Sequence, residues 1–225
     1  MLAALQLLTV LPIRSRSPES GRAAVWFPLV GALLGLAVAA VCTALPAQGP
    51  LLALMLLALV TGGLHEDGLA DVCDALRAYR SREKMLAILH DSRIGAHGAA
   101  GLVFSILIRW QALTQIQGEL WLRLPAAYAL SRGVMVLMAA ALPAAGEGLG
   151  RHFKDTLPRA AFPLVALQCA GLGYLLGPIT LAALALVLVS AGRWFHLRLG
   201  GATGDCLGFT CQLAEATALV VLAAA

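Results

Sequence analysis

Two long stretches without a charged side chain constrain this sequence more than any other feature. No Asp, Glu, Lys or Arg lies between Arg22 and Glu66, and none lies between Arg159 and Arg193. A hydrocarbon core about 30 Å thick requires about 20 apolar helical residues, so each stretch can hold two membrane spans. The chain is 60% hydrophobic and only 12% charged, which excludes an ordinary soluble domain and a disordered chain. We predict an all-α, polytopic integral membrane protein.

Further apolar runs raise the expected number of transmembrane helices to about seven, all in one domain. Each span should be helical, because lipid offers no hydrogen-bond partner to an open sheet edge. The opening segment MLAALQLLTVLPIR is interpreted as a short interfacial or re-entrant segment, since its arginines follow its apolar part and no cleavage site comes next. The predicted spans cover residues 23–45, 50–64, 95–116, 124–143, 160–176, 179–195 and 207–225.

Lys and Arg side chains gather in every second connection between the predicted spans, which are the connections on one side of the membrane. This set comprises the N-terminal segment and the 65–93, 144–159 and 193–206 loops, whereas the opposite set contains only Arg123. Positive charge near the ends of spans is retained on the cytoplasmic side. We therefore expect the N-terminus and these loops to be cytoplasmic. The five cysteines show no metal-ligand spacing and are predicted to be reduced, structural thiols.

The segment GGLHEDGLADVCD, residues 62–74, carries the most distinctive polar pattern. Asp67, Asp71 and Asp74 are spaced i, i+4, i+7 and so share one face of a helix. Like charges on one helical face repel one another unless a cation lies among them, and carboxylate oxygens favour Mg²⁺, Mn²⁺ or Ca²⁺. The alternative is a solvated acidic face at the mouth of a span. Glu66 points away from the three aspartates, and His65 is either a packed interfacial residue or a ligand.

Two other polar segments open predicted spans. In HDSRIGAHG, residues 90–98, Asp91 and Arg93 form either a local salt bridge or a site in which Arg93 holds a phosphate by two hydrogen bonds. In GGATGD, residues 200–205, the glycines and Asp205 are typical of a turn and a helix N-cap, and by themselves indicate no ligand.

Three ionisable residues fall at membrane depth, where a charge normally faces a polar interior. Arg132 lies well inside its span, whereas Arg109 lies near a span end and is expected to extend to the membrane surface. Glu215 is the natural partner for an intramembrane arginine. A buried structural pair and the lining of a substrate cavity both remain open.

Taken together, the motifs resemble one enzyme family. GGLHEDGLADVCDAL, DSRIGAHG, the intramembrane SRG, GEGLG and GGATGDCLG followed by QLAE occur in the order found in adenosylcobinamide-GDP ribazoletransferases, also called cobalamin synthases. LLTVLPIR and FPLVGALLGL near the N-terminus resemble the family as well. The similarity extends from about residue 7 to residue 215.

The resemblance implies a multi-pass enzyme of the bacterial inner membrane with its active site on the cytoplasmic face. It implies transfer of adenosylcobinamide phosphate from adenosylcobinamide-GDP to α-ribazole or its 5′-phosphate, with release of GMP, in a Mg²⁺-dependent step of cobalamin biosynthesis. No nucleic acid takes part in this reaction. The resemblance leaves open whether the enzyme forms a homo-oligomer or a complex with other cobalamin-assembly enzymes.

Site residues follow from the matching motifs together with the chemistry of phosphoryl transfer. Mg²⁺, or Mn²⁺ in its place, is expected at Asp67, Asp71 and Asp74. Asp91, Arg93 and Asp205 are the expected catalytic residues, with Asp91 or Asp205 as general base. Substrate or phosphate binding is expected at His65, Glu66, Arg93, Arg132 and Gly204.

Three other classes fit the sequence less well. A CDP-alcohol phosphotransferase-like lipid enzyme also carries aspartates on a helix, but with a different spacing and with Ala-Arg after the second aspartate, where this chain has Val72-Cys73-Asp74. A cation or corrinoid transporter would place acidic residues near the membrane midplane on broken or repeated helices. A non-catalytic assembly subunit would have no evident use for three aligned aspartates.

Overall fold

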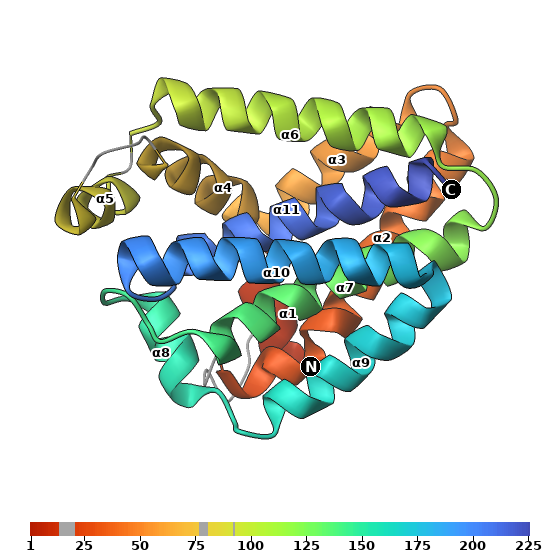
Figure 1. Cartoon of the computed structure of the whole chain (residues 1–225). Coiled ribbons are helices and arrows are strands. Elements are labelled where there is room, and N and C mark those ends of the chain that lie inside the picture. Colours follow the sequence, from red (N-terminus) through yellow and green to blue (C-terminus); the bar gives the residue numbers. More distant parts are fainter. Residues whose placement is uncertain (14–20, 77–80, 92) are drawn as a thin grey trace.

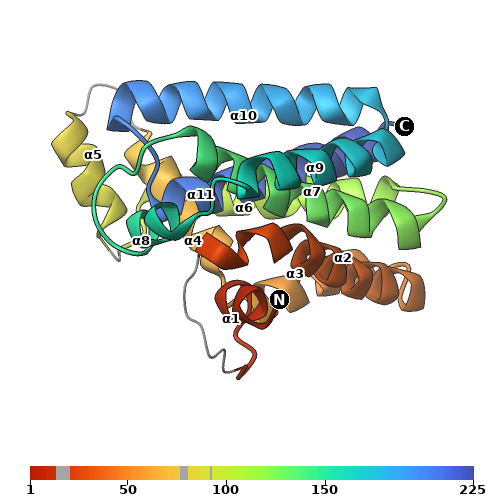
Figure 2. The ribbon, with the colours of Figure 1, turned by 90° about the horizontal axis from the view of Figure 1, so that it is seen from below.

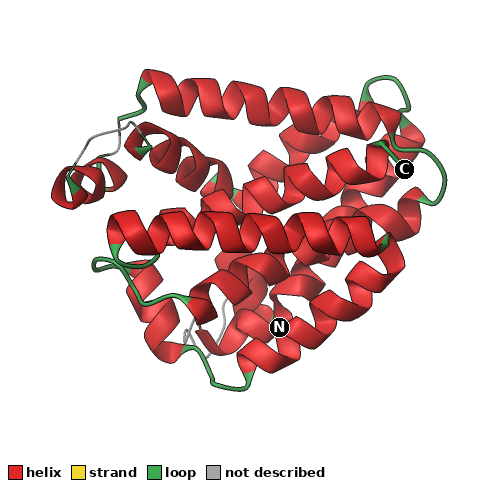
Figure 3. Cartoon of the chain, viewed as in Figure 1, coloured by secondary structure: helices red, strands yellow, loops and turns green. Residues whose placement is uncertain are grey.

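The structure, a computed structural model, describes residues 1–13, 21–76, 81–91 and 93–225. In these ranges it contains helices and their connections and no β-strand, apart from one isolated bridge between Ala144 and Ala202. Figure 3 shows the helices joined mostly by short loops. The predicted all-α fold is therefore confirmed. The five cysteines are free thiols, as expected.

Each of the seven predicted spans coincides with a helix, in the same order along the chain. The ends agree within four residues when the 3₁₀ helix η1 is counted with α2. Three shorter helices, α1, α5 and α8, and the acidic helix α4 complete the described fold (Figure 1). The elements are α1 Leu2–Leu8, η1 Gly21–Trp26, α2 Phe27–Ala44, α3 Gly49–Thr61, α4 Leu64–Ala75, α5 Arg82–Leu89, α6 Ala96–Gln115, α7 Leu120–Ala141, α8 Leu149–Thr156, α9 Ala161–Leu176, α10 Pro178–Leu199 and α11 Gly204–Ala223.

Helix α7 lies at the centre of the bundle, where it packs against α2, α9 and α11. Its residues 126–136 are all buried, as expected for a helix surrounded by other helices. Helix α2 approaches α7 through Gly31 and Gly35, where an added Cβ would overlap the α7 backbone. Two small residues four positions apart allow membrane helices to pack this closely. Figure 2 shows α7 and α11 between α10 on one side and α2 and α3 on the other.

A sharp turn separates the acidic helix α4 from α3. Gly62 and Gly63 both have positive φ angles, of 65° and 69°, which glycine adopts without steric cost. Gly62 ends α3 and Gly63 begins α4, and the two helix axes differ by 93°. The glycine pair thus ends the predicted 50–64 span and places the three aspartates on a separate helix beyond it.

Within the described residues, four helices are long and apolar enough to cross a membrane by themselves: Gly21–Ala44 with η1 included, α7, α10 and α11. The bent pairs α3–α4 and α8–α9 raise this number to six if each pair is one span. Helix α6 does not meet the same criterion, but its outward face carries exposed Val103, Phe104 and Leu107, which suits an apolar environment. The structure therefore supports a polytopic membrane protein, and the number seven stays a prediction.

The connections between helices form two groups at opposite ends of the bundle. Helices α5 and α8 and the α10–α11 turn lie at one end in Figure 1, and the α2–α3, α6–α7 and α9–α10 turns lie at the other. The first group contains the loops that are rich in Lys and Arg, so the fold gathers the predicted cytoplasmic loops at one end. Arg14, Arg16, Arg77 and Arg80, which contributed to that prediction, lie outside the described residues.

Candidate active site

The acidic helix α4 crosses the beginning of α11 at two glycines. A Cβ at Gly68 would lie 2.7 Å from the carbonyl oxygen of Asp205, and a Cβ at Gly208 would lie 3.4 Å from the Cα atom of Gly68. The glycine that interrupts the aspartates in the sequence is therefore required for this contact. The contact places Asp205 beside the acidic face of α4, so carboxylates at least 131 residues apart in the sequence form one group.

The electrostatics of this group centre on Asp71. Burial, and after it the negative charges of four other carboxylates, raise the pKa of the half-buried Asp71 to about 7. In decreasing order of effect these are Asp67, Asp205, Asp74 and Asp91. Such uncompensated negative charge favours either a proton or a cation. In the described part of the chain, however, no three His, Cys, Asp or Glu side chains are close enough to form a complete metal site.

Asp74 stabilises the backbone that begins α6. Its Oδ2 accepts a hydrogen bond of 2.7 Å from the amide of Gly95, and its Oδ1 accepts one of 2.9 Å from the amide of Gly98. The first amides of a helix lack partners within the helix, and a carboxylate is a strong cap for them. Asp74 therefore joins the C-terminal end of α4 to the N-terminus of α6. Its role as a metal ligand stays a prediction.

Asp91 and Arg93 form the local salt bridge that their spacing allows. The Arg93 guanidinium donates two short hydrogen bonds to Asp91, from Nε at 3.0 Å and from Nη2 at 2.7 Å. This pairing lowers the pKa of Asp91 to about 2. The Arg93 side chain is 86% exposed, so it is accessible to a ligand. Neither residue lines either of the two cavities described below, and their catalytic and phosphate-binding roles are untested predictions.

A buried network of charged side chains links α4 to α6, α7 and α11. Glu215 accepts hydrogen bonds from Arg132 and, at 3.0 Å, from Arg109. Glu66 lies 3.6 Å from Arg109 and accepts a hydrogen bond of 2.9 Å from Gln212. The predicted partnership between Glu215 and an intramembrane arginine is confirmed.

The expectation that Arg109 extends to the membrane surface is wrong. Its side chain is only 3% exposed, because Glu215 and Glu66 provide partners inside the bundle. Arg132 is 1% exposed, and its guanidinium donates hydrogen bonds to Glu215 and Ser131. Of the two interpretations of Arg132, the buried structural pair describes this geometry. A contact between Arg132 and substrate remains an untested prediction.

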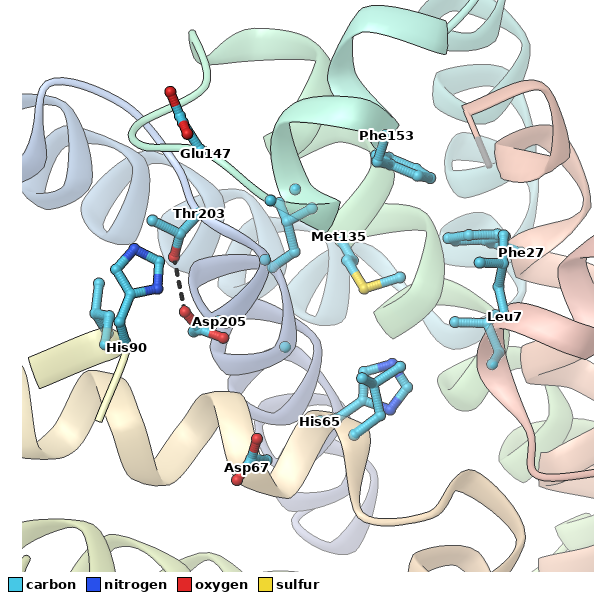
Figure 4. A pocket seen from close by; sticks show the side chains of 18 residues that line it. Leu7, Phe27, His65, Asp67, His90, Met135, Glu147, Phe153, Thr203 and Asp205 are labelled. Carbon is cyan, nitrogen blue, oxygen red and sulfur yellow. Dashed lines mark hydrogen bonds between the residues drawn. The ribbon is translucent and has the colours of Figure 1, made fainter. Parts of the chain in front are cut away.

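A first cavity of about 280 Å³ lies between α4, α7, α8, α11 and the N-terminal part of the chain. Figure 4 shows Glu147, His90 and Asp205 on one side of the view and Phe27, Phe153 and Leu7 on the other. Thr203 donates a hydrogen bond of 3.2 Å to Asp205 at the beginning of α11. The polar lining residues are His65, Asp67, His90, Glu147, Thr203 and Asp205, together with the glycines 148, 150, 204 and 208.

A second cavity of about 590 Å³ lies on the other side of α4. Asp71 and Glu66 line it from α4, and Ile94 and Leu102 line it from the beginning of α6 and the segment before it. Asp67 lines both cavities. The acidic face of α4 therefore separates two spaces and presents a carboxylate to each.

Several cavity residues carried no functional prediction. Glu147 belongs to the GEGLG motif, to which no residue role was assigned, and His90 begins the motif that pointed to Asp91 and Arg93. Phe27 and Phe153 resemble any other apolar side chain in a membrane sequence. Their place at the site depends on the packing of η1 against α8, which no local pattern indicates. His65 and Gly204, by contrast, were predicted and do line the first cavity.

Comparison with known proteins shows the family to which this sequence belongs. The family model described as cobalamin-5-phosphate synthase matches residues 1–223. The chain belongs to this family. Three relatives are each named adenosylcobinamide-GDP ribazoletransferase. The protein from Geotalea daltonii is 39% identical over 98% of this chain and 95% of its own length. The Pseudomonas aeruginosa PAO1 protein is 40% identical over 99% and 97%, and that from Klebsiella pneumoniae strain 342 is 40% identical over 98% and 97%. No solved structure matches the chain significantly.

Proposed function

We propose that this chain is an adenosylcobinamide-GDP ribazoletransferase, the activity for which its relatives are named. The observation that supports this most directly is the carboxylate group of α4 and α11 placed between two cavities. A transferase must bring two substrates to one point, and Asp67 is the charged residue that lines both cavities, beside Leu7 and Leu64. Family membership over nearly the whole chain identifies the substrates as adenosylcobinamide-GDP and ribazole.

The reaction exchanges one phosphate ester for another. A ribose hydroxyl of ribazole, or of its 5′-phosphate, attacks the phosphorus that bears the cobinamide. A new oxygen–phosphorus bond forms, the bond from that phosphorus to the oxygen of the GMP group breaks, and GMP leaves. The hydroxyl proton passes to a base. Enzymes accelerate such transfers chiefly by positioning the reactants and neutralising charge on the phosphate oxygens.

The carboxylate group fits a hard cation such as Mg²⁺ or Mn²⁺. Asp67 and Asp71 are the ligands that we propose first, because they line the cavities and because Asp71 is partly buried beside other carboxylates, which together raise its pKa. Asp74 can contribute only while its oxygens also hold the amides of Gly95 and Gly98. When bound, the ion would neutralise phosphate charge and lower the pKa of a bound hydroxyl.

The remaining roles fall to side chains at the same end of the fold. Asp205 lines the first cavity and Asp91 does not, so we propose Asp205 as the base that accepts the hydroxyl proton. Arg93 exchanges Asp91 for a substrate phosphate, which matches its exposure and its two parallel donors. Gly204 offers its amide at the positive end of α11. Glu66 holds α4 in place through Gln212 and Arg109.

The proposed location is the inner membrane of a bacterial cell. All three relatives come from bacteria. The end of the bundle that holds α5, α8 and both cavities would face the cytoplasm, because the loops there carry most of the Lys and Arg residues. Both substrates are water-soluble, so this orientation lets them reach the carboxylates without crossing the lipid.

The test is GMP release by the purified full chain in lipid nanodiscs. Adenosylcobinamide-GDP, ribazole and Mg²⁺ are supplied together and then with each one omitted. Release should require all three and should stop with a chelator. Asp71→Asn should abolish release, and Arg93→Lys should reduce it because a two-donor fork becomes a point charge. Asp155→Asn, an exposed carboxylate on α8 that lines neither cavity, is the matched control and should retain turnover.

Two outcomes would contradict the proposal. No release by folded wild-type protein with every component present would remove the transferase activity. Release by Asp71→Asn at the wild-type rate would leave the activity in place and remove Asp71 from the mechanism.

A further inference from the structure

The first cavity has an apolar part and a polar part, and this division identifies the substrate that fits it. Phe27 and Phe153 form the apolar part, with their rings stacked at a centroid distance of 5.5 Å and an interplanar angle of 29°. Met135 and Leu7 extend the same wall. Aromatic rings and a polarisable methionine form a favourable surface for a flat aromatic ligand.

His65 lies in the wall of this cavity with an unused hydrogen-bonding capacity. The residue is 1% exposed, and neither Nδ1 nor Nε2 has a hydrogen-bond partner among the described residues. A buried polar atom without a partner is costly, and native proteins nearly always satisfy such atoms. A neutral imidazole offers one donor and one acceptor, so a ligand with a single ring nitrogen could accept a hydrogen bond from it.

The opposite part of the cavity contains oxygen ligands for hydroxyl groups. Asp67 and Asp205 line it from α4 and α11, and Thr203 lies beside Asp205. In Figure 4 these side chains lie apart from the phenylalanine rings, with His65 and Met135 between the two groups. A ligand that extends across the cavity would therefore contact rings at one end and carboxylates at the other.

We propose that the first cavity is the ribazole site and that His65 and Phe153 determine its selectivity for an aromatic nucleoside. Ribazole is a flat base with one free ring nitrogen joined to a ribose, which matches the rings, the imidazole and the carboxylates in turn. The inference rests on the proposed transferase function and assigns one of its two substrates.

Size excludes the other substrate from this cavity. A volume of about 280 Å³ lies just below the usual range for small-molecule pockets, roughly 300–1,000 Å³, and a corrinoid is far too large for it. The second cavity, at about 590 Å³, adjoins the first at Asp67 and contains Asp71. Adenosylcobinamide-GDP would place its pyrophosphate there while the corrinoid stays outside.

The test separates the two substrates kinetically in nanodiscs. His65→Leu removes the hydrogen bond, His65→Gln keeps a donor and an acceptor, and Phe153→Leu removes a ring. Phe195→Leu is the matched control, because Phe195 is also buried in aromatic contacts but lines neither cavity. We expect His65→Leu and Phe153→Leu to raise the KM for ribazole about tenfold, with the KM for adenosylcobinamide-GDP unchanged. His65→Gln should recover part of the loss, and Phe195→Leu should leave both KM values unchanged.

A second measurement uses the wild-type protein and so does not depend on the folding of a variant. Ribazole alone should slow amide hydrogen exchange in α8, which lines only the first cavity, and leave residues 94–102 unchanged, since Ile94 and Leu102 line only the second. A change in the KM for adenosylcobinamide-GDP in place of ribazole, or protection of 94–102 in place of α8, would overturn the assignment. If the wild-type protein releases no GMP, the transferase proposal fails, and the exchange pattern still decides whether ribazole occupies this cavity.

Discussion

Replacing Glu215 with Gln should destabilise the protein strongly, because this carboxylate holds two buried arginines. Arg109 and Arg132 both donate to it, and all three side chains are at most 3% exposed. Gln keeps the shape of the side chain but removes its charge. Arg132 then has no carboxylate partner, and Arg109 retains only Glu66 at 3.6 Å. Removing one partner of a buried ion pair costs about 3–5 kcal/mol, since the other charge stays buried without compensation.

This cost corresponds to a large change in thermal midpoint. For a chain of 150–250 residues each kcal/mol shifts the midpoint by about 2–4 °C, so Glu215→Gln should lower it by roughly 6–20 °C. Tryptophan fluorescence of the protein in nanodiscs measures the midpoint. Glu119→Gln, an exposed glutamate before α7, is the control and should change stability by less than about 0.5 kcal/mol.

A double replacement separates the ion pair from simple loss of packing. Arg132→Met together with Glu215→Leu removes one positive and one negative charge, and leaves Arg109 with Glu66. Apolar side chains of similar volume often replace a buried ion pair at little cost, so the double variant should be more stable than Glu215→Gln. A midpoint for Glu215→Gln within 2 °C of wild type, or a double variant less stable than the single one, would refute the reasoning.

Three further predictions concern α4. The pKa of Asp71 is raised from 3.8 to about 7 in the folded protein. Between these two pH values the folded protein keeps a proton that the unfolded chain has released. Without metal, the free energy of unfolding should therefore fall as the pH rises from about 4 to 7. Asp71→Asn should flatten this profile in thermal melts, and at pH 8 Mg²⁺ should raise the midpoint of the wild type but not that of Asp71→Asn. Asp74→Asn loses one of the two hydrogen bonds to the backbone of α6, which should lower the free energy of unfolding by about 1–2 kcal/mol in the same melts. Mg²⁺ should still stabilise this variant. An unchanged midpoint would contradict the capping role of Asp74. Gly68→Ala places a methyl group 2.7 Å from the Asp205 carbonyl oxygen and should reduce turnover, whereas Gly171→Ala, which meets no atom within 4 Å, should not.

The helical framework was predictable because its signal is local. A run of apolar residues without charges indicates a span wherever it packs, and every such run is a helix in the structure. The three-aspartate motif was predictable for the same reason, since the spacing i, i+4, i+7 fixes relative direction on one helix. Gly62 and Gly63 marked the turn, but their effect, a 93° change of axis, depends on backbone angles that composition does not provide.

The contacts between distant segments were not predictable. The Arg109–Glu215 hydrogen bond joins residues 106 positions apart, and the Gln212–Glu66 bond joins residues 146 apart. The position of Arg109 near a span end suggested that its side chain reaches the surface. In the structure the side chain stays inside the bundle, because the buried carboxylate of Glu215 on α11 accepts its hydrogen bond. Asp74 looked equivalent to Asp67 and Asp71 in sequence, yet only its environment includes the unpartnered amides of α6.

The buried charges explain how a membrane bundle can hold a catalytic helix in register. Glu66 immediately precedes Asp67, and its side chain is fixed by Gln212 from α11 and by Arg109 from α6. Arg109 is in turn fixed by Glu215, which also holds Arg132 on α7. Any rotation of α4 about its own axis would therefore break a chain of ion pairs that reaches three spans. Apolar contacts alone would tolerate such a rotation, because lipid-like side chains repack at small cost. The network thus sets the direction of Asp67 and Asp71 from inside the membrane, while the carboxylates themselves remain at the cavities where the substrates meet.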